Sequence, residues 1–137
     1  CIASVHAGWR GTVSNIVKNA INMMTDKFGS NPCDIIAFIG PGICVDCYEV
    51  SQDTINEFRK NYSQSECELI IQPENKPGKY LLNLPGADYI NLINAGVRPE
   101  NIYLSDVCTS ENSDILFSHR ASSGKRGIMC NFIKIIN

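Results

Sequence analysis

The chain has 137 residues, the size of a single domain that can bury a hydrophobic core. Its composition, 44% hydrophobic and 19% charged, argues against a disordered, collagen-like or coiled-coil protein. The net charge is −2 and no basic run is longer than Lys125-Arg126, so we do not expect nucleic-acid binding. No apolar run approaches the length that crosses a membrane, so no membrane partner is expected either.

The seven cysteines and the first residues bear on the location and extent of the protein. An odd number of cysteines, without a recognisable secretory signal, is typical of reduced thiols in a cytoplasmic protein. The chain begins with Cys1 rather than Met, and it begins inside an apolar run that reads as a strand. We therefore predict one domain over residues 1–137 that lacks its N-terminal part.

In the first half of the chain, two strands and two helices are expected. Residues 1–5 predict a buried strand, and a turn at 8–11 leads into a helix capped by Gly11 or Thr12. Apolar residues from Val13 to Met24 recur at helical spacing, and Gly29 follows the last turn. Residues 34–39 predict a second strand, and 51–62 a second helix.

In the second half, strands are expected at 68–72, 80–84, 102–107 and 127–136, with one more helix at 86–95 that stops at Gly96. The order β-α-β-α-β-α-β-β indicates an α/β or α+β fold with sheets and helices in layers.

The sequence His-Ala-Gly-Trp-Arg-Gly at residues 6–11 is the densest functional pattern. His6 lies where the first predicted strand ends, and strand ends commonly position catalytic groups on a rigid scaffold. Gly8 and Gly11 permit close backbone approach, while Trp9 offers a stacking face and Arg10 a fixed cation. A buried structural histidine beside a packed Trp is the alternative, but the surrounding pattern favours function.

Cys44 and Cys47 have the Cys-x-x-Cys spacing of metal and redox sites. A structural zinc site would need a second such pair, and a thioredoxin-like site would lie at the start of a helix. Neither condition is met in the sequence, so two free thiols in a turn are the favoured interpretation. Redox or metal use stays the alternative.

Short polar groups at 106–109 and 118–120 complete the candidates. The hydroxyls of Thr109 and Ser118, with Arg120 two residues after Ser118, suit an anion or a ribose. A capped loop with a surface Arg explains them equally well.

Several segments together resemble one family, the laccase-domain or YfiH-like proteins. Its members were first called multicopper polyphenol oxidases and later described as zinc-dependent purine nucleoside phosphorylases. The matching segments are residues 6–12, 39–43, 47–50, 96–97, 101–102, 108–109, 117–120 and Gly127. They span nearly the whole chain in order, and the first of them is specific.

The resemblance implies a layered β-sandwich core flanked by helices, and a zinc site of two histidines and one cysteine. His6 resembles the last of these ligands, and the other two belong to motifs that precede this point in family members. The implied reaction is phosphorolysis of a purine nucleoside, with adenosine deamination as a further activity. Zinc supports the deamination because it lowers the pKa of bound water.

Candidate site residues follow from the pattern and the resemblance together. We expect His6 to bind zinc, and Arg10, His119 and Arg120 to act in catalysis. Arg10, Cys47, Cys108 and Thr109 are expected to contact substrate, with purine nucleoside and phosphate as partners. A homodimer is an open possibility.

Three other functions stay open. A polyphenol oxidase is less favoured because copper clusters are rich in imidazole, and only His6 and His119 are present. A cysteine hydrolase would need a thiolate within reach of an imidazole. A catalytically inactive module that keeps the fold is the third, since two metal ligands have no match in this chain.

Overall fold

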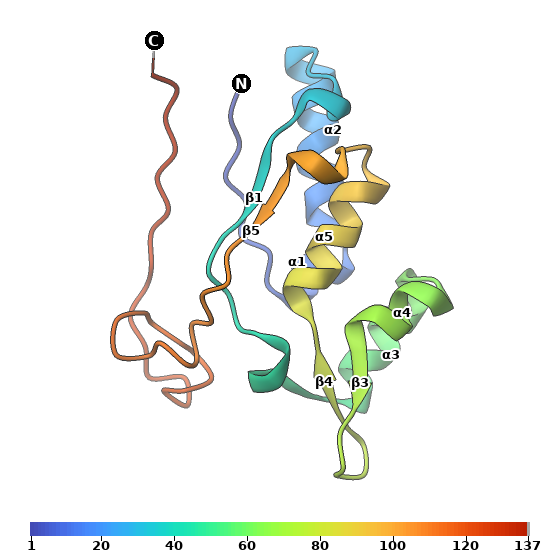
Figure 1. Ribbon diagram of the computed structural model, residues 1–137, viewed down its shortest axis with the longest axis vertical. Coiled ribbons are helices and arrows are strands. Elements are labelled where there is room, and N and C mark those ends of the chain that lie inside the picture. Colours follow the sequence, from blue (N-terminus) through green and yellow to red (C-terminus); the bar gives the residue numbers. More distant parts are fainter. Residues whose placement is uncertain (137) are drawn as a thin grey trace.

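The computed structural model describes residues 1–136, in which helices and short strands alternate (Figure 1). The helices are α1 (Trp9–Val13), α2 (Ile16–Phe28), α3 (Gln52–Asn61), α4 (Gln64–Ile70) and α5 (Leu84–Asn94). The strands are β1 (Ala37–Ile39), β2 (Glu49–Ser51), β3 (Ile71–Pro73), β4 (Lys79–Leu82) and β5 (Ile102–Leu104). Three 3₁₀ turns, η1 (Pro32–Asp34), η2 (Val45–Cys47) and η3 (Pro99–Asn101), connect them. The expected mixed α/β class is confirmed.

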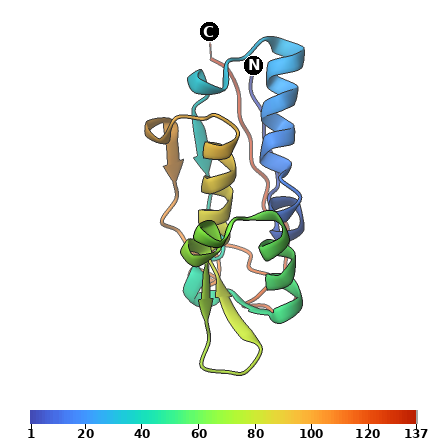
Figure 2. The same ribbon diagram turned by 90° about the vertical axis from the view of Figure 1, so that its right-hand side faces the viewer.

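The strands form two small sheets of different kinds. In the first, β1 and β5 are parallel and Phe38 pairs with Tyr103. In the second, β4 lies between β2 and β3 and pairs antiparallel with both. Helices α5 and α2 lie on one side of the β1–β5 pair, and the chain after residue 127 runs on the other side, as both views show (Figures 1 and 2).

Each sheet has its own buried hydrophobic cluster. The β1–β5 pair packs against α2 and α5 through Ile21, Leu92, Val97 and Ile102. The β2–β4–β3 sheet and helices α3, α4 and α5 share a second cluster of Val50, Ile55, Phe58, Tyr62, Ile70, Leu82 and Ala87. Trp9 and Val13 of α1 and Tyr48 after η2 pack against this second cluster. This second cluster therefore supports both α1 and the segment that follows η2.

The helix predicted from Gly11 or Thr12 is two helices. Asn15 adopts the left-handed conformation, at φ 56°, and its side chain accepts a hydrogen bond from the backbone N–H of Lys18. Asn tolerates this conformation, and an Asn side chain at the first position satisfies a free N–H of the helix. The capping prediction was therefore wrong: Gly8 precedes α1, and Asn15 caps α2.

Of the other predicted elements, the helices at 51–62 and 86–95 are confirmed as α3 and α5, and Gly96 has the expected positive φ, 93°. The strand predicted at 68–72 was wrong, because most of that segment belongs to α4. A reciprocal capping box between Ser63 and Glu66 starts this helix. Only β3 is extended there.

The strands predicted at 1–5 and 127–136 do not form among the described residues. A strand needs a partner for its backbone N–H and C=O groups, and neither segment pairs with another strand of residues 1–136. None of the helices in this range has the length and apolar character needed to span a bilayer.

Candidate functional site

The His6 turn, defined as residues 6–11, forms an open pocket at the start of α1. His6 is exposed, and Gly8, Trp9, Arg10 and Gly11 line the pocket with it. A Cβ added at Gly8 would lie 3.2 Å from Nε2 of His6, so a larger residue there would displace the exposed imidazole. The guanidinium of Arg10 lies over the ring of Trp9, 4.5 Å from its centroid. The pocket lining thus includes an imidazole and a cation.

A buried polar network fixes α1 behind this turn. The backbone carbonyl of Thr12 accepts a hydrogen bond of 3.0 Å from Nδ2 of Asn91 in α5. The hydroxyl of Tyr62 donates to Oδ1 of Asn91, also at 3.0 Å. Asp88, one turn before Asn91, is buried beside the Thr12 hydroxyl, and burial raises the pKa of its carboxyl to about 6. The bonds of Asn91 to the Thr12 carbonyl and to Tyr62 therefore tie α1 to α5. The nearby Asp88 Oδ1 and Thr12 hydroxyl, in contrast, have no hydrogen-bond partner among residues 1–136.

Tyr48 connects the two arginines that the sequence singled out. The guanidinium of Arg120 lies over the Tyr48 ring, 5.3 Å from its centroid. Burial raises the pKa of Tyr48, and the positive charges of Arg120 and Arg10 partly counteract this rise. Both arginines are therefore close enough to act on one phenol, although 110 positions separate them in the sequence.

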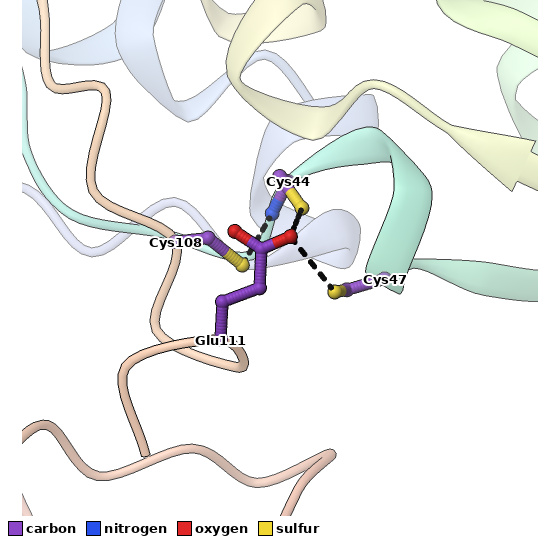
Figure 3. A group of neighbouring side chains, drawn as sticks. All are labelled: Cys44, Cys47, Cys108 and Glu111. Atoms are coloured by element: carbon purple, nitrogen blue, oxygen red, sulfur yellow. Dashed lines mark hydrogen bonds between the residues drawn. The ribbon is translucent and has the colours of Figure 1, made fainter. Parts of the chain in front are cut away.

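A second group of functional side chains, the thiol cluster, consists of Cys44, Cys47, Cys108 and Glu111. One ligand atom from each of the four residues lies within 4.8 Å of the others. The side chains point toward one another (Figure 3). The Cys44 backbone N–H donates to Sγ of Cys108 at 3.3 Å, and the Cys44 and Cys47 thiols lie 3.8 and 3.9 Å from Oε1 of Glu111. This donor set could hold a metal ion.

The electrostatics of the thiol cluster favour one thiolate. Burial and the neighbouring Cys108 sulfur raise the pKa of Cys44 to about 12. Burial also opposes ionisation of Cys108, but the backbone N–H groups of Cys44, Glu111 and Ser110 outweigh it and lower the pKa of Cys108. Since the thiolate is the form that binds metals, Cys108 is the ligand closest to its metal-binding state.

The thiol cluster lies beyond the carboxyl ends of the two parallel strands. Cys44 follows β1, and Cys108 follows β5. The backbone N–H of Ser105 donates to the Ile39 carbonyl, and that of Thr109 to the Gly42 carbonyl, both at 2.8 Å. An isolated parallel bridge joins Gly42 to Cys108. In open α/β sheets this is the edge at which ligands bind.

The structure brings together some of the predicted site residues and leaves others apart. Cys47 and Cys108, both expected to contact substrate, meet in the thiol cluster, and Thr109 is buried next to it. The exposed His119 imidazole lies near Gly124, where an added Cβ would be 3.5 Å from its Cε1. All seven cysteines are free, as expected.

Sequence reasoning missed Tyr48 and Glu111. Tyr48 was noted only as part of a matching segment, and its place between two arginines could be found only in the fold. Glu111 follows Cys108 at Cys-x-x-Glu spacing. This spacing is a sequence signal for a pair of metal ligands, one a thiol and the other a carboxylate.

The His6 turn and the thiol cluster differ in how many metal ligands they offer. A catalytic zinc needs three protein ligands and one open position. Among residues 1–136, His6 forms no metal-binding group of three with other His, Cys, Asp or Glu side chains, whereas the thiol cluster offers four ligands. His6 therefore fits as one ligand but does not make a site with the described residues alone.

Comparison with known proteins gives consistent matches along the chain. Residues 1–136 match the profile of a family described as multi-copper polyphenol oxidoreductase laccase. Purine nucleoside phosphorylase YlmD of Bacillus subtilis (strain 168) is 33% identical over 132 residues, which cover 96% of this chain and 46% of that protein. Adenosine deaminase RL5, from an unknown prokaryotic organism, is 34% identical over 119 residues, 87% of this chain and 44% of the relative.

A solved structure supports the same grouping. The crystal structure of the hypothetical protein YfiH of Bacillus licheniformis superposes with a TM-score of 0.82 at 36% identity, covering 88% of this chain and 45% of the other. The chain spans about half the length of the curated relatives it matches.

Proposed function

Because the chain belongs to the family described as multi-copper polyphenol oxidoreductase laccase, we propose that it carries part of the substrate site of a purine nucleoside phosphorylase. The resemblance noted in the segments from His6 to Gly127 is confirmed by this membership. The proposal follows the names of several relatives, among them YlmD. The substrates would be a purine nucleoside and inorganic phosphate.

One observation carries the proposal: Arg120 lies over the Tyr48 ring, and the positive charge of Arg10, in the His6 turn, acts on the same phenol. Arginine is suited to phosphate because its planar guanidinium donates two parallel hydrogen bonds to two oxygens. Two such groups near one aromatic ring combine a site for an anion with an apolar face for a base. Phosphorolysis needs both, since phosphate and nucleoside must be held together.

The reaction would proceed by attack of a phosphate oxygen on C1′ of the ribose. The bond from C1′ to the purine nitrogen breaks, the base leaves with the electron pair and takes a proton, and ribose 1-phosphate forms. The arginines would hold the phosphate and oppose its negative charge, and they would not transfer protons themselves. His119, beside Arg120, is the group in this segment that could donate a proton to the departing base.

We propose that His6 is one ligand of a zinc ion whose remaining ligands lie outside the described residues. Zinc in such a site would make a water molecule acidic enough to supply hydroxide near neutral pH. That chemistry would account for deamination of adenosine, the activity named for the relative RL5. The free thiols of this chain are consistent with a cytoplasmic protein.

The test uses the intact protein that carries this chain, with adenosine and phosphate as substrates and chromatographic separation of the products. Arg120→Gln should raise the KM for phosphate about 10- to 100-fold, the worth of one hydrogen bond to a charged group. His6→Ala should abolish turnover. Arg59→Gln is the matched control, because Arg59 lies over the Tyr80 ring in the same way, at 5.7 Å, but away from the His6 turn.

Adenine and ribose 1-phosphate would support phosphorolysis, and inosine formed without phosphate would support deamination. If Arg120→Gln and Arg59→Gln behave alike, the phosphate site is not at Tyr48. A folded, zinc-loaded parent protein that turns over neither adenosine nor inosine would overturn the proposal.

A further inference from the structure

The thiol cluster has the donor atoms and the spacing of a metal site that the proposed reaction does not use. A tetrahedral zinc with bonds of about 2.3 Å to sulfur places its ligand atoms about 3.8 Å apart. The two contacts of Glu111 Oε1 with the thiols of Cys44 and Cys47 measure 3.8 and 3.9 Å. The widest separation in the group is within 4.8 Å, so a contraction of about 1 Å would complete the tetrahedron.

The chemistry of the ligands selects the metal. Three thiolates disfavour magnesium and calcium, which take oxygen ligands, and favour soft metals, and a carboxylate as the fourth ligand suits zinc among these. Cys44 and Cys47 provide the two-residue gap found in many zinc sites, and Cys108 and Glu111 repeat that gap on the second segment. Four protein ligands would fill a tetrahedral zinc and leave no position for substrate.

The position of the cluster explains what a metal would do there. Cys108 is only 4% exposed and is held by the bridge to Gly42. Beyond it, residues 109–124 contain turns and neither helix nor strand, yet this segment carries Arg120, which must reach Tyr48. Tyr48 directly follows Cys47. A metal bound to both segments would fix the Arg120 segment against the Tyr48 segment.

We propose that Cys44, Cys47, Cys108 and Glu111 form a structural zinc site, separate from any metal held at His6. The proposal does not depend on the reaction, because it concerns ligands that would fill the coordination sphere. The exposed Glu111 is its weakest member, and the buried Cys108 is its anchor.

The first experiment measures zinc in the intact protein with His6→Ala as the background, by elemental analysis after exhaustive desalting. One zinc per chain should remain when His6 is absent, and Cys108→Ser should remove it. Cys67→Ser is the control, since Cys67 is a free, partly buried thiol outside the cluster. Replacement of zinc by Co(II) should give a thiolate charge-transfer band in the His6→Ala protein that weakens with each cysteine removed.

A second measurement works even if Cys108→Ser does not fold. Glu111→Gln keeps the shape of an exposed side chain and should weaken zinc binding at least about tenfold, as judged by competition with a chelator. In the parent protein, alkylation followed by mass spectrometry should find Cys44, Cys47 and Cys108 protected until zinc is chelated, and Cys33 labelled throughout.

Absence of zinc from the folded His6→Ala protein, or copper in its place, would overturn the proposal. So would equal labelling of Cys44 and Cys33 before and after chelation. Because these readouts need no substrate, failure here would be distinct from failure of the proposed phosphorolysis.

Discussion

The His6 turn and the thiol cluster differ in how the chain builds them. The turn is local: its imidazole, aromatic ring and cation come from six consecutive residues, and its side chains are largely exposed. The cluster is assembled from two segments, with 64 positions between Cys44 and Cys108, and its anchor is buried. One region offers a single metal ligand and an open pocket, whereas the other offers four ligands around one point.

This difference indicates two kinds of function. An open turn with one ligand and a cation is suited to a substrate that comes and goes. A group of four ligands around one point, which leaves no open coordination position, is suited to an ion that stays. Both regions nevertheless rest on the same hydrophobic cluster, since Trp9 and Tyr48 pack against it. Mutations in the shared hydrophobic cluster should therefore affect both regions, and mutations in one region should affect that region alone.

The largest effect is expected where the two regions share support. Phe58 is fully buried and stacks on Tyr62, with ring centroids 5.5 Å apart. Phe58→Ala should cost about 3–5 kcal/mol of stability, from lost burial and the cavity left behind. Urea unfolding measures this cost, and hydrogen exchange should show lost protection in both α1 and η2. Phe28→Ala, at an exposed position, is the control.

Loss of protection in only one of the two segments would contradict the shared support and make the regions independent.

An effect of intermediate size on stability is expected from Asp88 of α5, which is buried next to α1 and so concerns the His6 turn alone. The pKa of its carboxyl is raised to about 6, above the usual value near 3.9, so the stability of the folded protein is fully retained below about pH 4 and lost as pH rises through about 6. Asp88→Asn removes this loss and should stabilise the protein by about 3 kcal/mol above pH 7, but much less at pH 4.

Unfolding curves at several pH values, compared with those of the exposed Asp114→Asn, isolate the effect. If the free energies of unfolding of Asp88→Asn and the parent differ by the same amount at every pH, folding does not change the pKa of Asp88.

The smallest effect on stability is expected at the turn itself. Gly8→Ala places a Cβ 3.2 Å from Nε2 of His6, and the exposed imidazole must shift by a few tenths of an ångström. The free energy of unfolding should change by less than about 1 kcal/mol. The kcat/KM for the nucleoside should fall about 10- to 100-fold, since small displacements of a reacting group are costly. In Gly40→Ala, where the nearest atom is 4.0 Å from the added Cβ, activity should persist.

If activity survives Gly8→Ala unchanged, the position of His6 is not critical and the turn is structural.

The same contrast explains what could be predicted from sequence. The His6 turn was recognised because its residues are contiguous, and α3 and α5 because apolar spacing and Gly96 define them. Helix α4 was misassigned although the capping pair Ser63 and Glu66 was visible, since the apolar residues after it suggested a strand. Each half of the thiol cluster has a visible spacing, but their meeting could not be predicted, because the approach of Cys108 to Cys44 depends on the pairing of β1 with β5.

The Gly42–Cys108 bridge also sets an order of events during synthesis of the protein. The cluster can close only after the ribosome has made β5 and that strand has found β1, a long-range contact that forms late because loop closure comes first. Until then, Cys44 and Cys47 are two nearby thiols on an unfinished chain, without Cys108 and Glu111 beside them. Assembly of the four ligands therefore depends on the pairing of two short parallel strands.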